Sequence, residues 1–243
     1  MPNSSLLRKS RKNEKSAIIL CSGGLDSVTT ANYAKKYLKY SNIIILFFNY
    51  GQKSLIQERK CAKICSQHIM AKFMEIKLPE LKALSTSLIN IKGRIKKLEK
   101  KDLKDTRKES EKWYVPARNL VFLSYALSLS DSLFKKEKKK YNIFLGFKCE
   151  GQDSYPDSTQ EFIKEMNKIN KIASESKPKI KAPLTKKDKE DIILLASGLG
   201  VDLRNTFSCY VSGFKHCGSC LSCMLRKQGF YWSGIKDPTS YLK

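Results

Sequence analysis

Residues 17–38 contain the pattern that most constrains how this chain can fold. A short, wholly apolar run at 17–21 leads into the polar sequence Ser-Gly-Gly-Leu-Asp-Ser at 22–27. Apolar residues then recur at a helical spacing, at Val28, Ala31, Ala34 and Leu38. We therefore predict a strand buried on both faces of a parallel sheet, followed by a glycine loop and a helix.

The loop between this strand and this helix is typical of an anion-binding site. Backbone amides at a helix N-terminus lack intrahelical partners, the helix dipole adds positive charge there, and Ser22 and Ser27 add hydroxyls. No lysine follows the glycines, so this is not the Walker pattern, whose lysine reaches the β- and γ-phosphates. The loop suits a pyrophosphate that departs when the α-phosphate is attacked. Asp26 is the expected ligand of a magnesium ion shared with that pyrophosphate.

The rest of the chain alternates apolar runs with amphipathic segments. Strands are predicted at 43–49, 73–78 and 141–145, and helices at 55–70, at 120–133, through Phe162, Met166 and Ile169, and at 186–199. Ser54 with Gln57, and Thr185 with Asp188, have the spacing of helix-capping pairs. The alternation predicts an α/β fold, a doubly wound and mostly parallel sheet.

The chain is strongly basic, with a formal charge of +24 over 243 residues. Because its lysines are spread through nearly every segment, the charge is weak evidence for a nucleic-acid partner. Residues 1–15 are expected to form a basic tail, and the charged residues 91–112 an exposed, mobile excursion nearly devoid of core residues. Nothing resembles a membrane span or a signal peptide, which favours a cytoplasmic location.

Four cysteines near the C-terminus have the spacing of a metal site. Gaps of seven, two and two residues separate Cys209, Cys217, Cys220 and Cys223. Four thiolates saturate tetrahedral zinc and leave no position for water, so the expected site is structural. A redox Cys-x-x-Cys is the alternative that two overlapping pairs disfavour. His216 is expected beside the site or exposed, and Cys21, Cys61, Cys65 and Cys149 are expected to be small buried hydrophobes.

Two further motifs are candidates for ligand contacts. Tyr50-Gly51-Gln52 follows the strand at 43–49, at the carboxyl edge of the predicted sheet. Arg118 and Asn119 fall in the first turn of a helix, where a cation is unfavourable unless an anion such as a phosphate compensates it. Each motif has a plain alternative, a glycine turn for the first and a surface arginine for the second.

In their order along the chain, these motifs resemble the 7-cyano-7-deazaguanine synthase family, a queuosine-pathway branch of the ATP-pyrophosphatase superfamily. Besides the glycine loop and the cysteine cluster, the matching pieces are Tyr50-Gly51-Gln52, Val115-Pro116-Ala117-Arg118-Asn119, Asp153 with Tyr155-Pro156-Asp157, Pro183-Leu184, Ser208-Cys209-Tyr210, Arg226, Gly229-Phe230 and Lys236-Asp237-Pro238. The departures are Ser158-Thr159, Lys53-Ser54 and the lysine-rich 91–112. The resemblance implies an adenine-nucleotide alpha-hydrolase-like domain over 16–205 and a small zinc-binding segment over 206–243.

The resemblance also implies an activity. Such an enzyme converts 7-carboxy-7-deazaguanine and ammonia to the nitrile, through an adenylated acid and an amide, with ATP and Mg²⁺ as substrate and Zn²⁺ as a structural ion. Free ammonia is the expected nitrogen source, because no Cys/His glutaminase constellation is apparent. A homodimer is expected, without a stable nucleic-acid partner or a membrane.

The same resemblance assigns residues to roles. Asp26 and Arg118 are the expected catalytic residues. The residues expected to bind ATP are Cys21, Ser22, Gly23, Gly24, Leu25, Asp26, Ser27, Val28, Thr29, Thr30, Ala31, Gln52 and Asn119. Those expected to bind the deazaguanine acid are Tyr50, Asp153, Tyr155 and Asp157.

Three alternatives stay open from the sequence. A tRNA-modifying adenylase would share the glycine loop and suit the charge, but such enzymes usually carry an added RNA-binding region. A zinc-bearing RNA-binding module would explain the cysteines and leave the glycine loop without a purpose. A relative that joins the deazaguanine acid to a different amine would need the same motifs.

Overall fold

The fold was obtained as a computed structural model, which describes residues 14–148, 155–211 and 213–242. Within these ranges the strands form one five-stranded sheet in the order β3-β2-β1-β4-β5, and every neighbouring pair is parallel. The strands are β1 (Ser16–Leu20), β2 (Asn42–Asn49), β3 (Lys72–Lys77), β4 (Tyr141–Leu145) and β5 (Ile180–Lys181). Because the order reverses at β1, the carboxyl edge of β1 is where such a sheet opens a crevice.

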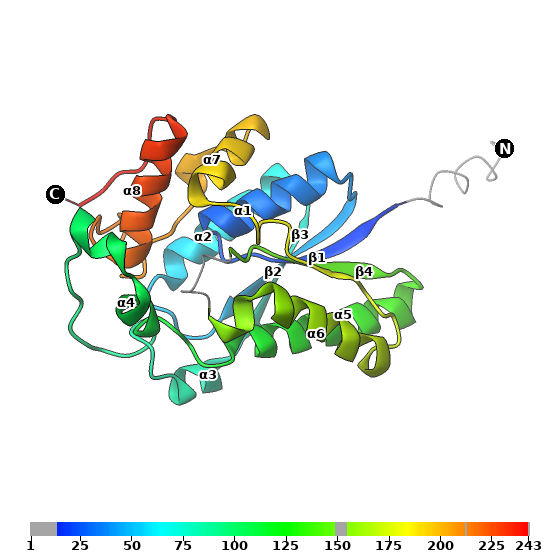
Figure 1. The fold of residues 1–243 in the computed structure, drawn as a ribbon. Coiled ribbons are helices and arrows are strands. Elements are labelled where there is room, and N and C mark those ends of the chain that lie inside the picture. Colours follow the sequence, from blue (N-terminus) through cyan, green and yellow to red (C-terminus); the bar gives the residue numbers. More distant parts are fainter. Residues whose placement is uncertain (1–13, 149–154, 212, 243) are drawn as a thin grey trace.

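Helices cover both faces of the sheet (Figure 1). One face carries α1 (Leu25–Asn32), which continues into the π-helical turn η2 (Tyr33–Tyr37), together with α2 (Leu55–His68) and α7 (Lys189–Gly198). The other face carries α5 (Arg118–Glu137) and α6 (Gln160–Ala173), while α8 (Leu221–Ser233) packs against α7. The predicted doubly wound α/β sheet is therefore confirmed.

The alternation of side chains along β1 explains why two cores form. Ala17 and Ile19 face the core under α1 and α2, whereas Ile18 faces the core under α5. Successive side chains of a strand point to opposite faces, so a wholly apolar strand fits only a sheet that is covered twice. Each fully buried aliphatic side chain contributes roughly 1.5–3 kcal/mol to stability.

Helix boundaries correct two of the predicted capping pairs. Ser54 precedes α2, but its hydroxyl donates to the carboxylate of Glu58 instead of pairing with Gln57. Helix α7 begins after Asp188, which forms its capping box with Asp191 and not with Thr185. The two-residue strand β5 was not predicted, because so short a run carries no periodic signal.

The segment 91–112 contains structure that its composition did not suggest. It includes the short helices η3 (Lys100–Lys104) and α4 (Arg107–Glu111). Leu98 and Glu109 are buried, and the backbone N–H of Leu98 donates to the carbonyl of Ser219 at 2.9 Å. Leu98 thus joins the hydrophobic core although the segment as a whole is exposed, and its mobility stays a prediction.

Three short helices complete the described secondary structure: α3 (Pro79–Leu84), η5 (Pro156–Ser158) and η6 (Leu203–Asn205). None of the helices in the described ranges combines the length and the apolarity that crossing a membrane requires. Most of the expected basic tail, and also Cys149 and Asp153, lie outside the described residues.

Candidate active site

A cavity of about 280 Å³ opens at the carboxyl edge of the sheet, where β1, β2 and β4 end. Predicted site residues from distant parts of the sequence line it together: Cys21, Ser22, Gly24, Leu25, Asp26, Ser27, Tyr50, Gln52, Arg118, Asn119 and Tyr155. The lining does not include Gly23, Asp157 or the α1 residues Val28, Thr29, Thr30 and Ala31. The predicted contacts of these residues with ATP or with the acid substrate stay predictions.

The glycine loop is held tightly from behind. Gly23 has φ +78°, and a Cβ there would collide with the carbonyl oxygen of Glu58 and the amide of Ala62 in α2. The carbonyl of Gly23 accepts a hydrogen bond from the backbone N–H of Phe207 at 2.9 Å. Ser27 Oγ donates to the carbonyl of Gly24 at 3.1 Å. Contacts within the protein thus fix the shape of the loop. A preformed loop loses little conformational entropy when it binds an anion.

Asp26 forms an ion pair that the sequence did not predict. Lys189 Nζ lies 2.9 Å from both carboxylate oxygens of Asp26, and both side chains are largely shielded from solvent. Lys148 lies near this pair, and its pKa is lowered to about 8 because it is buried and because Lys189 adds positive charge. Two ammonium groups next to the glycine loop suit a polyphosphate better than the loop alone.

Arg118 begins helix α5 after a strained residue. Ala117 adopts a left-handed backbone conformation, with φ 53°. Arg118 Nη1 donates to the hydroxyl of Tyr50 at 3.2 Å, and its guanidinium lies over the rings of Tyr50 and Phe122. No described carboxylate lies within ion-pair distance of Arg118. A partly buried, oriented cation that forms no ion pair with a described carboxylate, next to unusual backbone geometry, suits an anionic ligand.

Asp157 supplies the negative charge at the start of α5. Its Oδ2 accepts the backbone N–H of Asn119 at 2.9 Å, and its Oδ1 has no partner among the described residues. Tyr155, which does line the cavity, donates its hydroxyl to the carbonyl of Ser110 at 2.8 Å, and burial raises its pKa to about 12. Asp157 therefore supports the wall that Asn119 and Tyr155 form.

Glu58 is a second acid in the cavity that sequence reasoning missed. Its Oε1 accepts from Ser54 Oγ at 2.5 Å and its Oε2 from Gln52 Nε2 at 2.9 Å. Gln52 Nε2 also donates to the carbonyl of Phe48, and its Oε1 accepts the N–H of Tyr50. Both amide hydrogens of Gln52 are therefore used within the protein, and its predicted contact with ATP is not tested by this geometry.

The four predicted metal ligands come together in a second, separate cluster. The sulfur atoms of Cys209, Cys217, Cys220 and Cys223 all lie within 4.8 Å of one another. Sγ–Sγ distances of 4.0 Å and 3.9 Å are close to the roughly 3.8 Å that a tetrahedron with zinc–sulfur bonds of about 2.3 Å requires. Backbone amides of Cys217 and Cys220 donate to neighbouring sulfurs, which stabilises thiolates. The donor set fits a tetrahedral ion of the zinc type.

The other sulfur and imidazole groups are accounted for differently. His216 is buried. Its Nε2 accepts a hydrogen bond from the backbone N–H of Ser208 at 3.1 Å, so this nitrogen is already used within the protein and does not serve as a metal ligand. Cys21, Cys61 and Cys65 are buried, as predicted.

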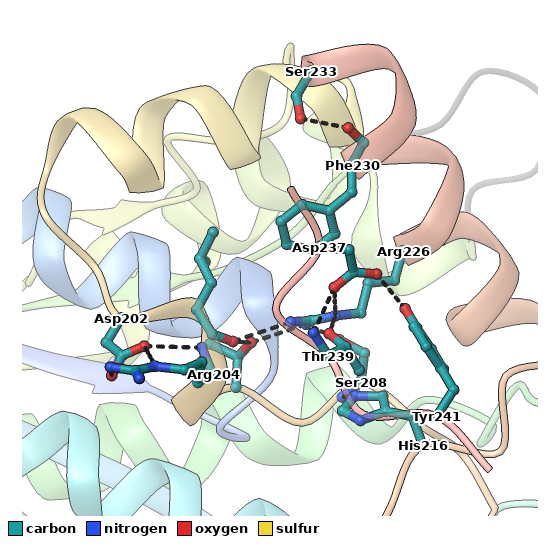
Figure 2. A network of polar contacts seen from close by, with 12 residues as sticks. Asp202, Arg204, Ser208, His216, Arg226, Phe230, Ser233, Asp237, Thr239 and Tyr241 are labelled. Carbon is teal, nitrogen blue, oxygen red and sulfur yellow. Dashed lines mark hydrogen bonds and ion pairs between the residues drawn. The ribbon is translucent and has the colours of Figure 1, made fainter. Parts of the chain in front are cut away.

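Arg226 ties the cysteine segment to the rest of the chain (Figure 2). This side chain is only 1% exposed. It donates to Thr239 Oγ1 at 2.8 Å, to Thr206 Oγ1 at 2.9 Å, to Ser208 Oγ at 3.2 Å and to the carbonyl of Leu203 at 3.1 Å. Asp237, 4.0 Å from Nε, supplies the opposite charge. A buried guanidinium with this many partners fixes the segment firmly.

Comparison with known proteins gives a consistent result. The family model of the queuosine biosynthesis protein QueC matches residues 16–234. The chain is 38% identical over 231 residues to the 7-cyano-7-deazaguanine synthase of Methanosphaera stadtmanae, covering 93% of this chain and 98% of that protein. The proteins of the same name from Methanococcus vannielii and Methanocaldococcus jannaschii are 39% and 34% identical over 238 residues, at 93% of this chain and 98% and 99% of theirs.

Proposed function

The chain belongs to the queuosine biosynthesis protein QueC family, and from this we propose that it is an ATP-dependent ligase that makes 7-cyano-7-deazaguanine from 7-carboxy-7-deazaguanine and ammonia. The observation that carries the proposal is the glycine loop without a Walker lysine, with Asp26 in the first turn of α1, in a chain that matches the synthases over 93% of its length. That loop suits a departing pyrophosphate.

The chemistry requires activation twice. Ammonia cannot displace oxide from a carboxylate, so the acid oxygen first attacks the α-phosphate of ATP and pyrophosphate leaves. Ammonia then displaces AMP from the acyl adenylate to give the amide, with loss of a proton. A second ATP activates the amide oxygen, which departs with AMP while the nitrogen loses two protons and forms the nitrile.

The residues near the loop have roles that follow from their charges. Ser22, Gly24 and Ser27 would hold the pyrophosphate, and Asp26 would hold the magnesium ion that accompanies ATP and offsets its charge. Lys189 forms an ion pair with Asp26. We infer that its ammonium moves to the phosphates when nucleotide binds, since it would otherwise compete with the metal for the same carboxylate.

Arg118 is the residue we assign to charge stabilisation during adenylation. Its guanidinium is oriented by Tyr50 and Asn119 and forms no ion pair with a described carboxylate. A preorganised cation that faces developing negative charge lowers a barrier without reorganisation cost. Tyr50 and Tyr155 would form walls of the acid-binding part of the cavity.

We propose that the four-cysteine cluster holds one structural Zn²⁺, because four sulfur ligands leave no open position for water. A homodimer and a cytoplasmic location complete the proposal. Both rest on the family resemblance alone.

The proposal is tested by incubating purified protein with ATP, Mg²⁺, ammonium and 7-carboxy-7-deazaguanine and identifying products by mass spectrometry. We expect the nitrile, with AMP and pyrophosphate. Product that forms only on tRNA, with steep salt dependence, would instead identify a tRNA-modifying adenylase. Product with another amine in place of ammonia would identify a relative with a different nitrogen donor.

A further inference from the structure

The cavity is lined by two acidic side chains in the described part of the chain, and only one of them forms an ion pair with a described residue. Asp26 is paired with Lys189. Glu58 forms no ion pair with a described lysine, arginine or histidine. Burial raises the pKa of its carboxyl group, although the hydrogen bonds from Ser54 and Gln52 and the more distant charge of Arg118 act in the opposite direction. Nothing in the proposed chemistry above uses Glu58.

Glu58 is held in place by two uncharged donors. Ser54 Oγ and Gln52 Nε2 each donate to a different carboxylate oxygen, at 2.5 Å and 2.9 Å. A carboxylate can accept about four hydrogen bonds. One further donor can therefore approach each oxygen, and a ligand with two neighbouring uncharged donors would satisfy both.

The position of Glu58 in the fold limits which part of a bound substrate its carboxylate can contact. Glu58 belongs to α2, which lies on the same face of the sheet as α1 (Figure 1). The backbone carbonyl of Glu58 packs directly behind Gly23. The carboxylate is held at the end of β2, the neighbour of β1 in the sheet. Arg118 and Tyr155 lie on or beside α5, which covers the opposite face.

A nucleotide with its phosphates on the glycine loop has its ribose next to the loop, since one carbon joins the ribose ring to the α-phosphate oxygen. The ribose carries two adjacent hydroxyls, which are uncharged donors at the spacing of a carboxylate. We propose that Glu58 accepts hydrogen bonds from the ribose hydroxyls of ATP, and that Gln52 and Ser54 are its positioning residues. This rests on the proposed use of ATP.

The test measures nucleotide binding without the deazaguanine acid, so that no turnover is needed. Titration calorimetry compares ATP with 2′-deoxy-ATP and 3′-deoxy-ATP, each with Mg²⁺. Hydrogen bonds to a charged group correspond to roughly 10-fold or more in affinity. We expect wild type to prefer ATP over a deoxy analogue by about 10-fold, and Glu58→Gln to bind ATP more weakly and to lose most of that preference.

Matched controls separate this role from a structural one. Glu80→Gln changes an exposed glutamate at the start of α3 and should leave all affinities unchanged. If Glu58→Gln weakens all three nucleotides equally and keeps the preference, Glu58 only supports the loop and the inference is wrong. Wild type that binds the deoxy analogues as tightly as ATP overturns it without any variant, even if Glu58→Gln fails to fold.

Two further outcomes are distinguishable. Inosine triphosphate lacks the adenine amino group but keeps the ribose. If the difference between wild type and Glu58→Gln disappears with this nucleotide, Glu58 contacts the base and the ribose assignment falls. If ribose discrimination is found but no nitrile forms, the inference stands while the proposed reaction fails.

Discussion

Lys189 Nζ lies 2.9 Å from each carboxylate oxygen of Asp26, although the two residues are 163 positions apart in the sequence. The glycine loop lacks the lysine that follows the glycines in Walker loops, and the fold places Lys189, at the start of α7, against Asp26 beside the loop. This lysine reaches the loop from the side of α1 and is not part of the loop's own backbone.

Asp26→Asn should abolish nitrile formation while the protein stays folded. The amide keeps the shape of the side chain but loses the charge that would bind magnesium on the departing pyrophosphate. Loss of such electrostatic stabilisation typically costs about 10²–10³ in rate. Chromatography of the nucleotides gives the measurement; ADP as the main wild-type product, or near-normal turnover of the variant, would contradict the assignment.

Lys189→Met should raise the KM for ATP by about 10-fold or more, because a charge-assisted contact to phosphate is lost. Lys189→Arg keeps the charge and serves as the control. The same Met variant leaves Asp26 unpaired, so thermal stability should fall slightly in the absence of nucleotide. An unchanged KM would place Lys189 in a purely structural role.

Lys148 should make ATP affinity depend on pH. Burial and the charge of Lys189 lower its pKa to about 8, so its ammonium is present below that pH and is lost as the pH rises through it. Because phosphates favour the charged form, ATP affinity should fall between about pH 7 and about pH 9. Lys148→Met should flatten this part of the profile, and an identical slope in both proteins would contradict the prediction.

Purified protein should contain one zinc per chain. Cys220→Ser removes one of four sulfur ligands and should lower both metal content and thermal stability, since the binding energy of structural zinc is folding energy. Cys61→Ser, a buried cysteine outside the cluster, is the control for metal content. A zinc-free, fully folded native protein in elemental analysis would refute the site.

Arg226→Met should destabilise the protein by about 3 kcal/mol, because several hydrogen bonds to a charged group are lost in a buried place. Methionine fills much of the same volume. The decrease in the free energy of unfolding therefore reflects the lost hydrogen bonds to the polar partners in Figure 2 and not the creation of a cavity. Chemical denaturation measures the change in the free energy of unfolding. Arg204→Met, on an exposed arginine paired locally with Asp202, should change it little.

The fold was predictable from the sequence because its signals are local. The apolar run at 17–21 requires a sheet covered on both faces, and the cysteine spacing requires only that a short segment fold back on itself. Both features are confirmed by the sheet and by the sulfur cluster. The helix boundaries were predicted less accurately, because side-chain capping competes with other local hydrogen bonds. Thr185, for example, donates its hydroxyl to the carbonyl of Ala182 and does not cap α7.

The missed residues, Lys189 and Glu58, share a different property. Each contributes through contacts that depend on the arrangement of separate elements, and neither stands out locally in a chain with 47 lysines and arginines and 23 acidic residues. Leu98 was missed for the same reason, since a single apolar residue in a charged segment has no periodic partner. The predicted role of Asp153 in the substrate pocket stays a prediction, because this residue lies outside the described residues.

The hydrogen bond from Phe207 to Gly23 joins the two sites of the molecule. Phe207 stands two positions before Cys209, so the backbone that shapes the glycine loop continues directly into the cysteine cluster. We expect that a cell short of zinc would lose nucleotide binding by this chain together with its folded C-terminal segment. The supply of the modified tRNA nucleoside would then follow the supply of a trace metal that takes no part in the reaction.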